Sequence, residues 1–304
     1  MNLGKALSMT KNEQTDVGSE AGGNGQVCAI IIAYDSCLAH LEKILSVVAS
    51  ECTIIVADNS EDPKKAKKIE QCVLASHGTY IGMRGNAGIA AAQNMAIRVA
   101  LEMETNFLLL LDDDCLPQPG MVAILLGCAI KFQNRAVVSA VALDDRKVDV
   151  SNVRGTKGTL VACRDLTSSG TLIPKVIFEQ VGFFDQSLFV DGVDFDWGWR
   201  ALALGIPLYI TRDTYIGHRR GEYSIAGCIP VPAPIRHYYQ FRNMPVLMFR
   251  THTPVAWRCT RIIKLPVKII LIALLMPRRV ERLRYALAGL RDAICGFSGK
   301  IGPL

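Results

Sequence analysis

The chain has 304 residues, half of them hydrophobic, and a formal net charge of +6, which is enough for one large domain with a true core and an appendage. The charge is uneven, because residues 250–304 carry eleven Lys/Arg and two Asp/Glu, a local balance of +9. A basic C-terminal region predicts an anionic surface as its partner and argues against nucleic-acid binding along the whole protein.

The N-terminal residues and the cysteines both indicate the cellular compartment of the protein. Residues 1–26 are polar, rich in Gly, Asn, Glu and Ser, and lack the apolar core of a signal peptide, so they predict a mostly disordered leader. The ten cysteines include no C-x-x-C pair. This pattern argues against a disulfide framework or a zinc site and indicates the reduced thiols of a cytoplasmic protein.

Buried strands and helices alternate in the first half of the chain. Strands are predicted at 27–34, 52–60 and 107–112, and helices at 37–49, 66–76 and 86–104. The alternation favours an α/β fold with a mostly parallel central sheet and helices on both faces. Because ligands bind outside the carboxyl ends of such strands, Asp35, Asp58 and Asp112–Asp114 are expected to cluster at one edge.

The second half continues this alternation and then changes character. A helix is predicted at 121–132, a strand at 136–143, a helix that ends at Gly205 and a strand at 207–218. Beyond residue 250, the longest uninterrupted apolar run is Ile269–Met276, whereas a bilayer span takes about 20 residues.

The last predicted helix, residues 280–297, is amphipathic. It places Leu283, Leu287, Leu290 and Ile294 on one face and its arginines elsewhere. This pattern is typical of a helix that lies in a membrane interface, although a helix pair that binds a partner protein would show it too.

The stretch "FLLLLDDDCLPQPG", residues 107–120, runs from a buried strand into three aspartates. Carboxylates one residue apart can share a divalent cation with a diphosphate, since Mg²⁺ favours few carboxylates plus substrate phosphate oxygens. A solvated acidic loop or a helix cap is the alternative. The preceding strand and the P-x-P-G turn fix the acids in place and favour the metal site.

The stretch "DGVDFDWGWR", residues 191–200, is a second candidate site. Aromatic neighbours raise the pKa of a carboxylate, and a carboxylate of this kind could deprotonate an incoming hydroxyl. Alternatively, these acids stabilise a helix N-terminus, with Asp196 and Arg200 forming an i,i+4 ion pair.

Two weaker signals remain. In "RGNAGIAAAQN", residues 84–94, small residues would let the backbone approach a ligand and Arg84 could meet a phosphate, but helix packing through alanine explains the pattern equally well. His218 closes a strand. A lone histidine more often has a structural role, and His218 is a candidate ligand only because the predicted metal site needs a further ligand.

Taken as an ordered set, the motifs "AIIIAY", "IIVADNS", "GNAGIAAAQN", "LLLLDDDCLPQPG", "VGFFDQSLFVDGVDFDWGWRALALG" and "IGHRRG" resemble those of inverting family 2 glycosyltransferases. The resemblance is strongest to the bacterial rhamnosyltransferase branch, whose downstream motif is similar to "YYQFRN" at 238–243. It implies a GT-A fold, a Rossmann-like nucleotide-diphospho-sugar transferase, over residues 27–250. Residues 251–304 then form a basic amphipathic helical tail at the membrane.

The resemblance also implies roles for individual residues. Asp58 would read the base and Asp112 would contact the ribose or diphosphate. Asp114 would hold Mg²⁺ or Mn²⁺, with His218 as a later metal or diphosphate contact, and Asp194 matches the position of the catalytic base. Further donor-binding candidates are Ala33, Tyr34, Asp35, Arg84, Asn86, Gly88, Asn94 and Asp113. Acceptor-side candidates are Asp191, Asp196, Trp197 and Arg242.

The implied substrates are a dTDP- or UDP-sugar, typically dTDP-L-rhamnose, and a lipid-linked or growing surface glycan at the inner face of the cell membrane. The sequence departs from the family pattern at Ala33-Tyr34-Asp35, where Thr-Tyr-Asn is usual, at an inserted Ala57, and at Asp196, where Glu is usual. These departures bear on the donor sugar rather than on the fold.

Two other classes were weighed against the transferase. A non-catalytic glycan- or nucleotide-binding module would leave the acids as surface features. A sugar nucleotidyltransferase would need a glycine-rich loop with a basic residue after the first strand, and "AYDSCLAH" contains none.

Overall fold

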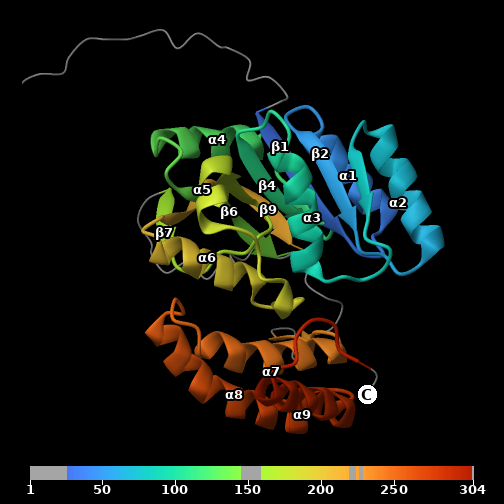
Figure 1. Ribbon diagram of the computed structural model, residues 1–304. Coiled ribbons are helices and arrows are strands. Elements are labelled where there is room, and N and C mark those ends of the chain that lie inside the picture. The colour runs from blue at the N-terminus through green and yellow to red at the C-terminus, as the bar shows by residue number, and fades with distance from the viewer. Residues whose placement is uncertain (1–25, 145–158, 219–223, 226–228, 303–304) are drawn as a thin grey trace, which may run out of the picture.

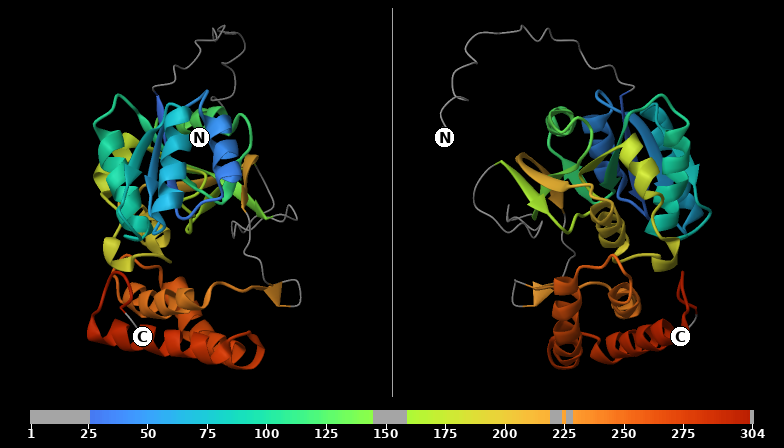
Figure 2. Two further views of the ribbon diagram at one scale, coloured as in Figure 1. Left: turned by 90° about the vertical axis from the view of Figure 1, so that its right-hand side faces the viewer. Right: turned by 60° about the vertical axis from the view of Figure 1, so that its left-hand side comes forward.

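The computed structural model describes residues 26–144, 159–218, 224–225 and 229–302, so the predicted leader lies outside the described residues except for Gln26. The chain forms an α/β part and, as a separate layer beside it, a helical C-terminal part (Figure 1, Figure 2).

The elements follow the predicted alternation closely. The α/β part contains β1 (Val27–Ala33), α1 (Leu38–Val48), β2 (Thr53–Asp58), α2 (Pro63–Ala75), β3 (Thr79–Gly82), α3 (Ile89–Leu101), β4 (Phe107–Asp112), β5 (Cys115–Pro117), α4 (Met121–Lys131), β6 (Val137–Asp144), β7 (Leu160–Cys163), β8 (Thr171–Pro174), α5 (Lys175–Val181), the 3-10 helix η1 (Gln186–Leu188), α6 (Val193–Ala203) and β9 (Leu208–His218). The C-terminal part contains β10 (Ser224–Ile225), β11 (Ile229–Pro230), α7 (Pro234–Met248), α8 (Val255–Leu275) and α9 (Arg279–Cys295).

The central sheet has the strand order β3-β2-β1-β4-β8-β6-β9-β5, with β7 paired to β9. Strands β3, β2, β1 and β4 are mutually parallel, and β6 and β9 are parallel to each other. Strands β8, β5 and β7 run antiparallel to their neighbours. The sheet is therefore mixed but mostly parallel, as the α/β alternation predicts.

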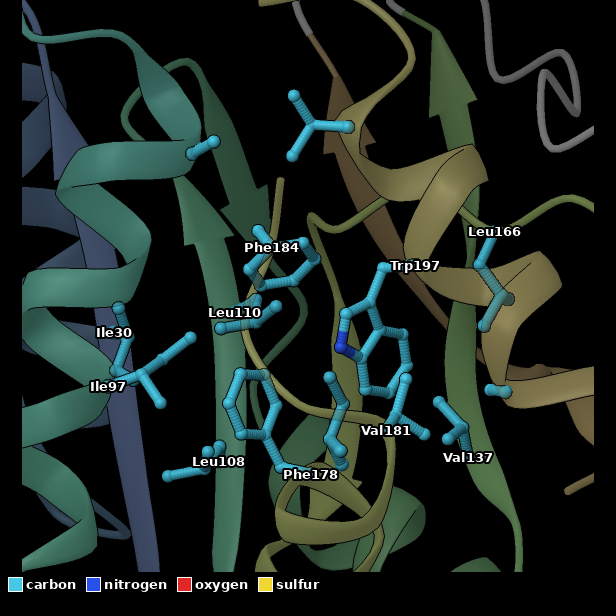
Figure 3. Packing of buried hydrophobic residues seen from close by; sticks show 14 of the residues in the cluster. Ile30, Ile97, Leu108, Leu110, Val137, Leu166, Phe178, Val181, Phe184 and Trp197 are labelled. Atoms are coloured by element: carbon cyan, nitrogen blue, oxygen red, sulfur yellow. The ribbon is translucent and has the colours of Figure 1, made fainter. Parts of the chain in front are cut away.

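Strand alternation divides the hydrophobic core between the two faces of the sheet. Ile30 and the even-numbered positions of β1 pack against α3, α5 and α6, whereas Ile31 and the odd-numbered positions pack against α1, α2 and α4. On the first face, the rings of Phe178, Phe184 and Trp197 gather beside β4 (Figure 3). Both faces of β1 are buried because helices cover both, which explains its uninterrupted apolar sequence.

Helix α7 packs along α9 in the C-terminal part (Figure 1). The contact is closest at Gly289, where an added Cβ would lie 2.3 Å from the carbonyl oxygen of Tyr238 and 3.0 Å from the backbone nitrogen of Arg242. Only a hydrogen fits between the two backbones. The "YYQFRN" motif lies on α7, so this motif and the segment beyond residue 250 share one helical unit.

The helix predicted at 280–297 forms as α9 and α8 lies within the predicted helical tail, but their apolar residues are not arranged as predicted, and α7 was not predicted. On α9, Leu287 and Ile294 are exposed, whereas Leu283 and Leu290 pack against a cluster that includes Ile272 of α8. The larger exposed apolar surface lies on α8 and consists of Ile262, Ile263, Val267, Ile270, Leu271, Leu274 and Leu275. No helix in the described ranges is long and apolar enough to cross a bilayer.

The close contact at Gly289 predicts that a larger residue at this position destabilises the protein. Gly289→Ala forces a methyl group into the Tyr238 carbonyl and should lower the free energy of unfolding by about 1–3 kcal/mol, the usual cost of overpacking. Gly127→Ala is the matched control, because Gly127 is an exposed residue of α4 with open space around its Cα hydrogens. This control should gain up to about 1 kcal/mol from helix propensity. Urea unfolding checks both, and a Gly289→Ala midpoint equal to that of the wild type would contradict the packing argument.

Candidate active site

The carboxyl ends of three adjacent parallel strands bring the acidic motifs together. Strand β1 lies between β2 and β4, with Ala33 opposite Asp58 and Ile32 opposite Asp112. The strand exits therefore meet at the same edge of the sheet, the edge at which open α/β sheets bind ligands.

Asp113 joins the exits of β4 and β1. Its carboxylate accepts a hydrogen bond from the backbone N–H of Tyr34 at 2.9 Å and another from the hydroxyl of Ser36. Burial raises the pKa of Asp113, while the two hydrogen bonds lower it. The side chain thus orders the loop that follows β1, beside the exposed ring of Tyr34.

Asp58 has a similar ordering role at the exit of β2. Its buried carboxylate accepts hydrogen bonds from the Ser60 hydroxyl at 2.5 Å, the Ser60 N–H at 2.9 Å and the Tyr80 hydroxyl at 2.9 Å. The Ser60 hydroxyl in turn accepts from the backbone N–H of Asp35 at 2.8 Å, and Lys65 pairs with the Asp35 carboxylate at 3.1 Å. This network fixes the exits of β1 and β2, where the nucleotide base is predicted to bind.

Asp112 and Asp114 form the crowded acidic pair at the exit of β4. Ligand atoms of Asp112, Asp114 and Cys115 all lie within 4.8 Å of one another. Burial first, and then the charges of Asp114 and Asp194, raise the pKa of Asp112 to about 8. A carboxylate held this way must bind a proton or a cation at neutral pH, so the pair fits a hard divalent ion such as Mg²⁺ or Mn²⁺.

Cys115 and His218 complete the surroundings of this pair. Burial raises the pKa of the Cys115 thiol far above neutrality, so it stays a neutral thiol and a poor ligand for a hard cation. The backbone of His218 lies in β9, opposite Cys115 of β5 and Asp144 of β6. The side chain of His218 and residues 219–221 of the "IGHRRG" motif lie outside the described residues, so the predicted metal contact stays a prediction.

Asp194 lies in the first turn of α6, which begins after a loop of unusual backbone conformation. Phe189 and Asp191 have φ values of 63° and 60°, and the N-cap Gly192 is left-handed with φ 89°. The partly buried carboxylate of Asp194 accepts a hydrogen bond from the N–H of Phe195 at 3.1 Å. Burial raises the pKa of Asp194 to about 6, and its charge acts on Asp112. The base candidate and the acidic pair are therefore neighbours.

Arg242 and Asn243 hold the loop that precedes α6. Both are buried, and the guanidinium of Arg242 donates to the carbonyls of Ser187 at 3.1 Å and Leu188 at 2.8 Å. The amide of Asn243 donates to the carbonyls of Leu188, Val190 and Asp191 at 2.6–2.8 Å. The structure thus places Arg242 inside the protein, not on the acceptor side, because backbone carbonyls take up its donors. We call these two residues the α7 clamp.

Asp196 and Trp197 are also placed inside the protein. The carboxylate of Asp196 is fully buried, with Arg200 at 3.1 Å and His252 at 2.7 Å, and Arg250 also pairs with it. The i,i+4 pair with Arg200, the alternative to an active-site role, is thus present. The indole N–H of Trp197 donates to the carbonyl of Gly182 at 2.8 Å. Neither side chain reaches the solvent edge of the site.

The "GNAGIAAAQN" segment mainly joins α3 to the loop around Phe189. An added Cβ on Gly88 would lie 2.6 Å from the Phe189 ring, and the amide of Asn94 makes two 2.9 Å hydrogen bonds with the backbone of Phe184. Asn86 accepts from the N–H of Gly88 at 3.0 Å. Arg84 is exposed and remains available to a ligand. Close packing explains most of this motif.

Arg236 is a site residue that the sequence did not indicate. It lies in the first turn of α7, and its Nη2 and Nε atoms lie 2.5 and 3.3 Å from the two carboxylate oxygens of Asp191. Arg236 also lowers the pKa of Asp112. The sequence pointed to Arg242, another basic residue of α7, because Arg242 belongs to the "YYQFRN" motif. It gave no sign of Arg236, because no spacing pattern links this residue to an acid more than forty positions earlier.

Solved structures of other proteins share this architecture. The chain is similar to GalNAc-T7 solved with UDP, GalNAc and Mn²⁺, with a TM-score of 0.55 and 13% identity over 79% of this chain and 54% of that one. It is also similar to S. aureus TarS residues 1–349, with a TM-score of 0.53 and 14% identity over 88% of this chain and 81% of that one. At such identities the likeness concerns the fold alone, and that fold is the GT-A fold of glycosyltransferases.

Residues 28–187, more than half of the chain, match Glycosyl transferase family 2, so the chain belongs to this glycosyltransferase family. It is 28% identical to dTDP-rhamnosyl transferase RfbF of Shigella flexneri over 91% of this chain and 98% of that protein. It is also 28% identical to the galactofuranosyltransferase GlfT1 of Mycolicibacterium smegmatis over 64% of each chain. The family resemblance of the motifs is thereby confirmed.

The α7 clamp predicts the effect of an isosteric substitution. Asn243→Asp replaces an amide donor with a carboxylate that faces three carbonyl oxygens. It should lower the free energy of unfolding by about 1–3 kcal/mol, the cost of a buried polar group without partners. It should also speed amide hydrogen exchange at Val190–Asp194. Asn134→Asp, at an exposed position, is the control and should change neither quantity. Unchanged exchange in Asn243→Asp would show that the clamp does not order this loop.

Proposed function

We propose that this glycosyltransferase moves L-rhamnose from dTDP-L-rhamnose to a lipid-linked or growing cell-surface glycan, with inversion at the anomeric carbon. The single observation that carries the chemistry is the placement of the Asp194 carboxylate in the first turn of α6, where its charge acts on Asp112 of the acidic pair and burial raises its pKa to about 6. The similarity to RfbF over nearly the full length of both chains supports rhamnose as the sugar.

The donor's diphosphate would bind at the acidic pair. Asp112 and Asp114 would hold Mg²⁺ or Mn²⁺, which, when bound, supplies positive charge for the departing diphosphate. Tyr34 and the loop fixed by Asp58 would form the nucleotide pocket at the exits of β1 and β2. This arrangement needs no change in the observed hydrogen bonds of Asp113 and Asp58.

Asp194 would act as the general base in a single displacement. As the acceptor oxygen attacks C1 of the sugar, the C1–O bond to the β-phosphate breaks and its electron pair leaves on the phosphate oxygen. The acceptor proton passes to Asp194, whose partial burial keeps its pKa high enough to accept that proton near neutral pH. Attack from the face opposite the leaving group inverts the anomeric centre.

The base assignment predicts both a variant and a pH profile. Asp194→Asn should lower kcat by about 10²–10⁴-fold while donor binding is retained, because the amide cannot accept the proton. In the wild type, kcat/KM should fall about tenfold per pH unit on the acid side, because protonation of Asp194 removes the base. That fall should begin at or below about pH 6, since a bound cation lowers the pKa further.

A panel of nucleotide sugars with Mg²⁺ or Mn²⁺, assayed by release of nucleoside diphosphate, measures both effects. Glu179→Gln, on α5 outside the site, is the control and should keep the wild-type rate and profile. Turnover by Asp194→Asn within tenfold of the wild type would refute the base assignment. Release of no nucleoside diphosphate from any donor by the wild type would refute the proposed reaction.

We also propose that α8 docks on an anionic membrane surface, at the inner face of the cell membrane. Its exposed apolar stripe lies on the far side of the helix from the buried Ile272. Exposed basic residues lie on α8 and at the start of α9, namely Lys264, Arg278, Arg279 and Arg284. An apolar stripe with basic residues on the same helical unit matches the chemistry of an acyl–headgroup boundary rich in anionic lipid, where the acceptor lipid would also lie.

Replacing three stripe residues tests the docking surface. The triple variant Ile263→Gln, Val267→Gln, Leu274→Gln should lose co-sedimentation with phosphatidylglycerol vesicles, because it loses buried apolar area, while donor hydrolysis continues.

The control replaces three equally exposed apolar residues of the α/β part, Leu74, Ile130 and Leu204, with Gln. It should sediment like the wild type. Sedimentation of the stripe variant at the wild-type level would exclude α8 as the docking surface. A stripe-dependent dimer in light scattering without vesicle binding would identify a second copy of the chain as the occupant.

A further inference from the structure

The guanidinium of Arg236 lies at the junction of the acidic pair, the base and the C-terminal helices. It forms a two-point ion pair with Asp191, at 2.5 and 3.3 Å. Its side chain is nevertheless 50% exposed, whereas that of Asp191 is 17% exposed. Within the described part of the chain, no group accepts a hydrogen bond from Nη1, so one edge of the guanidinium faces solvent.

Two further carboxyl groups of the site act on Arg236 besides its ion-pair partner Asp191. The pKa of Arg236 is raised first by Asp191 and also by Asp114 and Asp194. The guanidinium thus lies within electrostatic reach of both the metal-holding carboxylate and the base. Under the proposed function, a cationic group within reach of both carboxyl groups is near the position that the β-phosphate of a donor must occupy.

The excess of negative charge at the site favours a further cationic group at the position of Arg236. A divalent cation adds two positive charges, but Asp112, Asp113, Asp114, Asp191 and Asp194 gather five carboxyl groups at the site. The bound diphosphate brings further negative charge, and its charge grows as the glycosidic bond breaks. Arginine suits such a site, because its planar fork can bind a carboxylate on one edge and phosphate oxygens on the other.

We propose that the free edge of Arg236 binds the β-phosphate of the sugar donor and stabilises the departing nucleoside diphosphate, while Asp191 positions the guanidinium. This inference rests on the proposed function. It gives the C-terminal helical part a direct role at the reacting centre, since Arg236 belongs to α7.

Nucleotides that differ only in the β-phosphate separate this role from a structural ion pair. With Mn²⁺ present, Arg236→Gln should weaken binding of dTDP or UDP at least tenfold in calorimetry, while binding of the matching monophosphate, followed by NMR titration, stays within twofold. Arg236→Lys should recover only part of the loss, because an ammonium group cannot bind Asp191 and phosphate with two parallel edges. Arg135→Gln, exposed at the end of α4, is the control and should bind like the wild type.

The outcomes distinguish this inference from the proposed function. If the wild type binds dTDP or UDP and Asp114→Asn weakens that binding, but Arg236→Gln does not, only the role of Arg236 is overturned. Equal losses for the diphosphate and the monophosphate in Arg236→Gln would also overturn it, because a purely structural ion pair would act on both. If the wild type binds neither diphosphate with Mn²⁺, the proposed function itself fails.

Discussion

The α7 clamp is the contact on which the site depends. Two buried side chains, Arg242 and Asn243, satisfy backbone carbonyls of the segment 187–191, which would otherwise be buried without donors. Each such hydrogen bond from a charged donor contributes about 1.5–3 kcal/mol, more than a neutral one. The clamp therefore offsets the strain of the positive-φ residues Phe189 and Asp191 and fixes where α6 begins.

Fixing the start of α6 brings like charges together. The charge of Asp194 then acts on Asp112, whose pKa is raised by burial and by the charges of Asp114 and Asp194, while burial and the charge of Asp191 raise the pKa of Asp194. Left alone, this crowding destabilises the fold at neutral pH. The same crowding creates a strong preference for a cation at the acidic pair and a proton acceptor a short distance away, which is the arrangement a displacement at a sugar carbon needs.

Under the proposed roles of Asp194 and Arg236, the C-terminal helices belong to the catalytic architecture. Helix α9 supports α7 through the backbone contact at Gly289, and α7 supplies both the clamp and Arg236. On the opposite side of the same unit, α8 exposes its apolar stripe. One helical unit therefore connects the exposed apolar stripe with the loop that carries Asp194, the proposed base, an arrangement that would keep the reacting groups near a membrane-borne acceptor.

The sequence alone determined the α/β alternation, the edge at which the acids gather, and the family, because strand burial and turn residues are local signals that a short motif carries. It pointed to Arg242 and missed Arg236 on the same helix, and it placed Asp196 on the acceptor side, next to the base candidate Asp194. Two residues of the same charge on one helix differ only in the direction of their side chains. Whether such a side chain points into the interior or toward the site depends on how distant segments of the chain pack together. Only the tertiary structure decided that Asp196 and Arg242 are buried in the interior. It also showed that Gly88 and Asn94 serve close packing, and that α8 rather than α9 carries most of the exposed apolar surface.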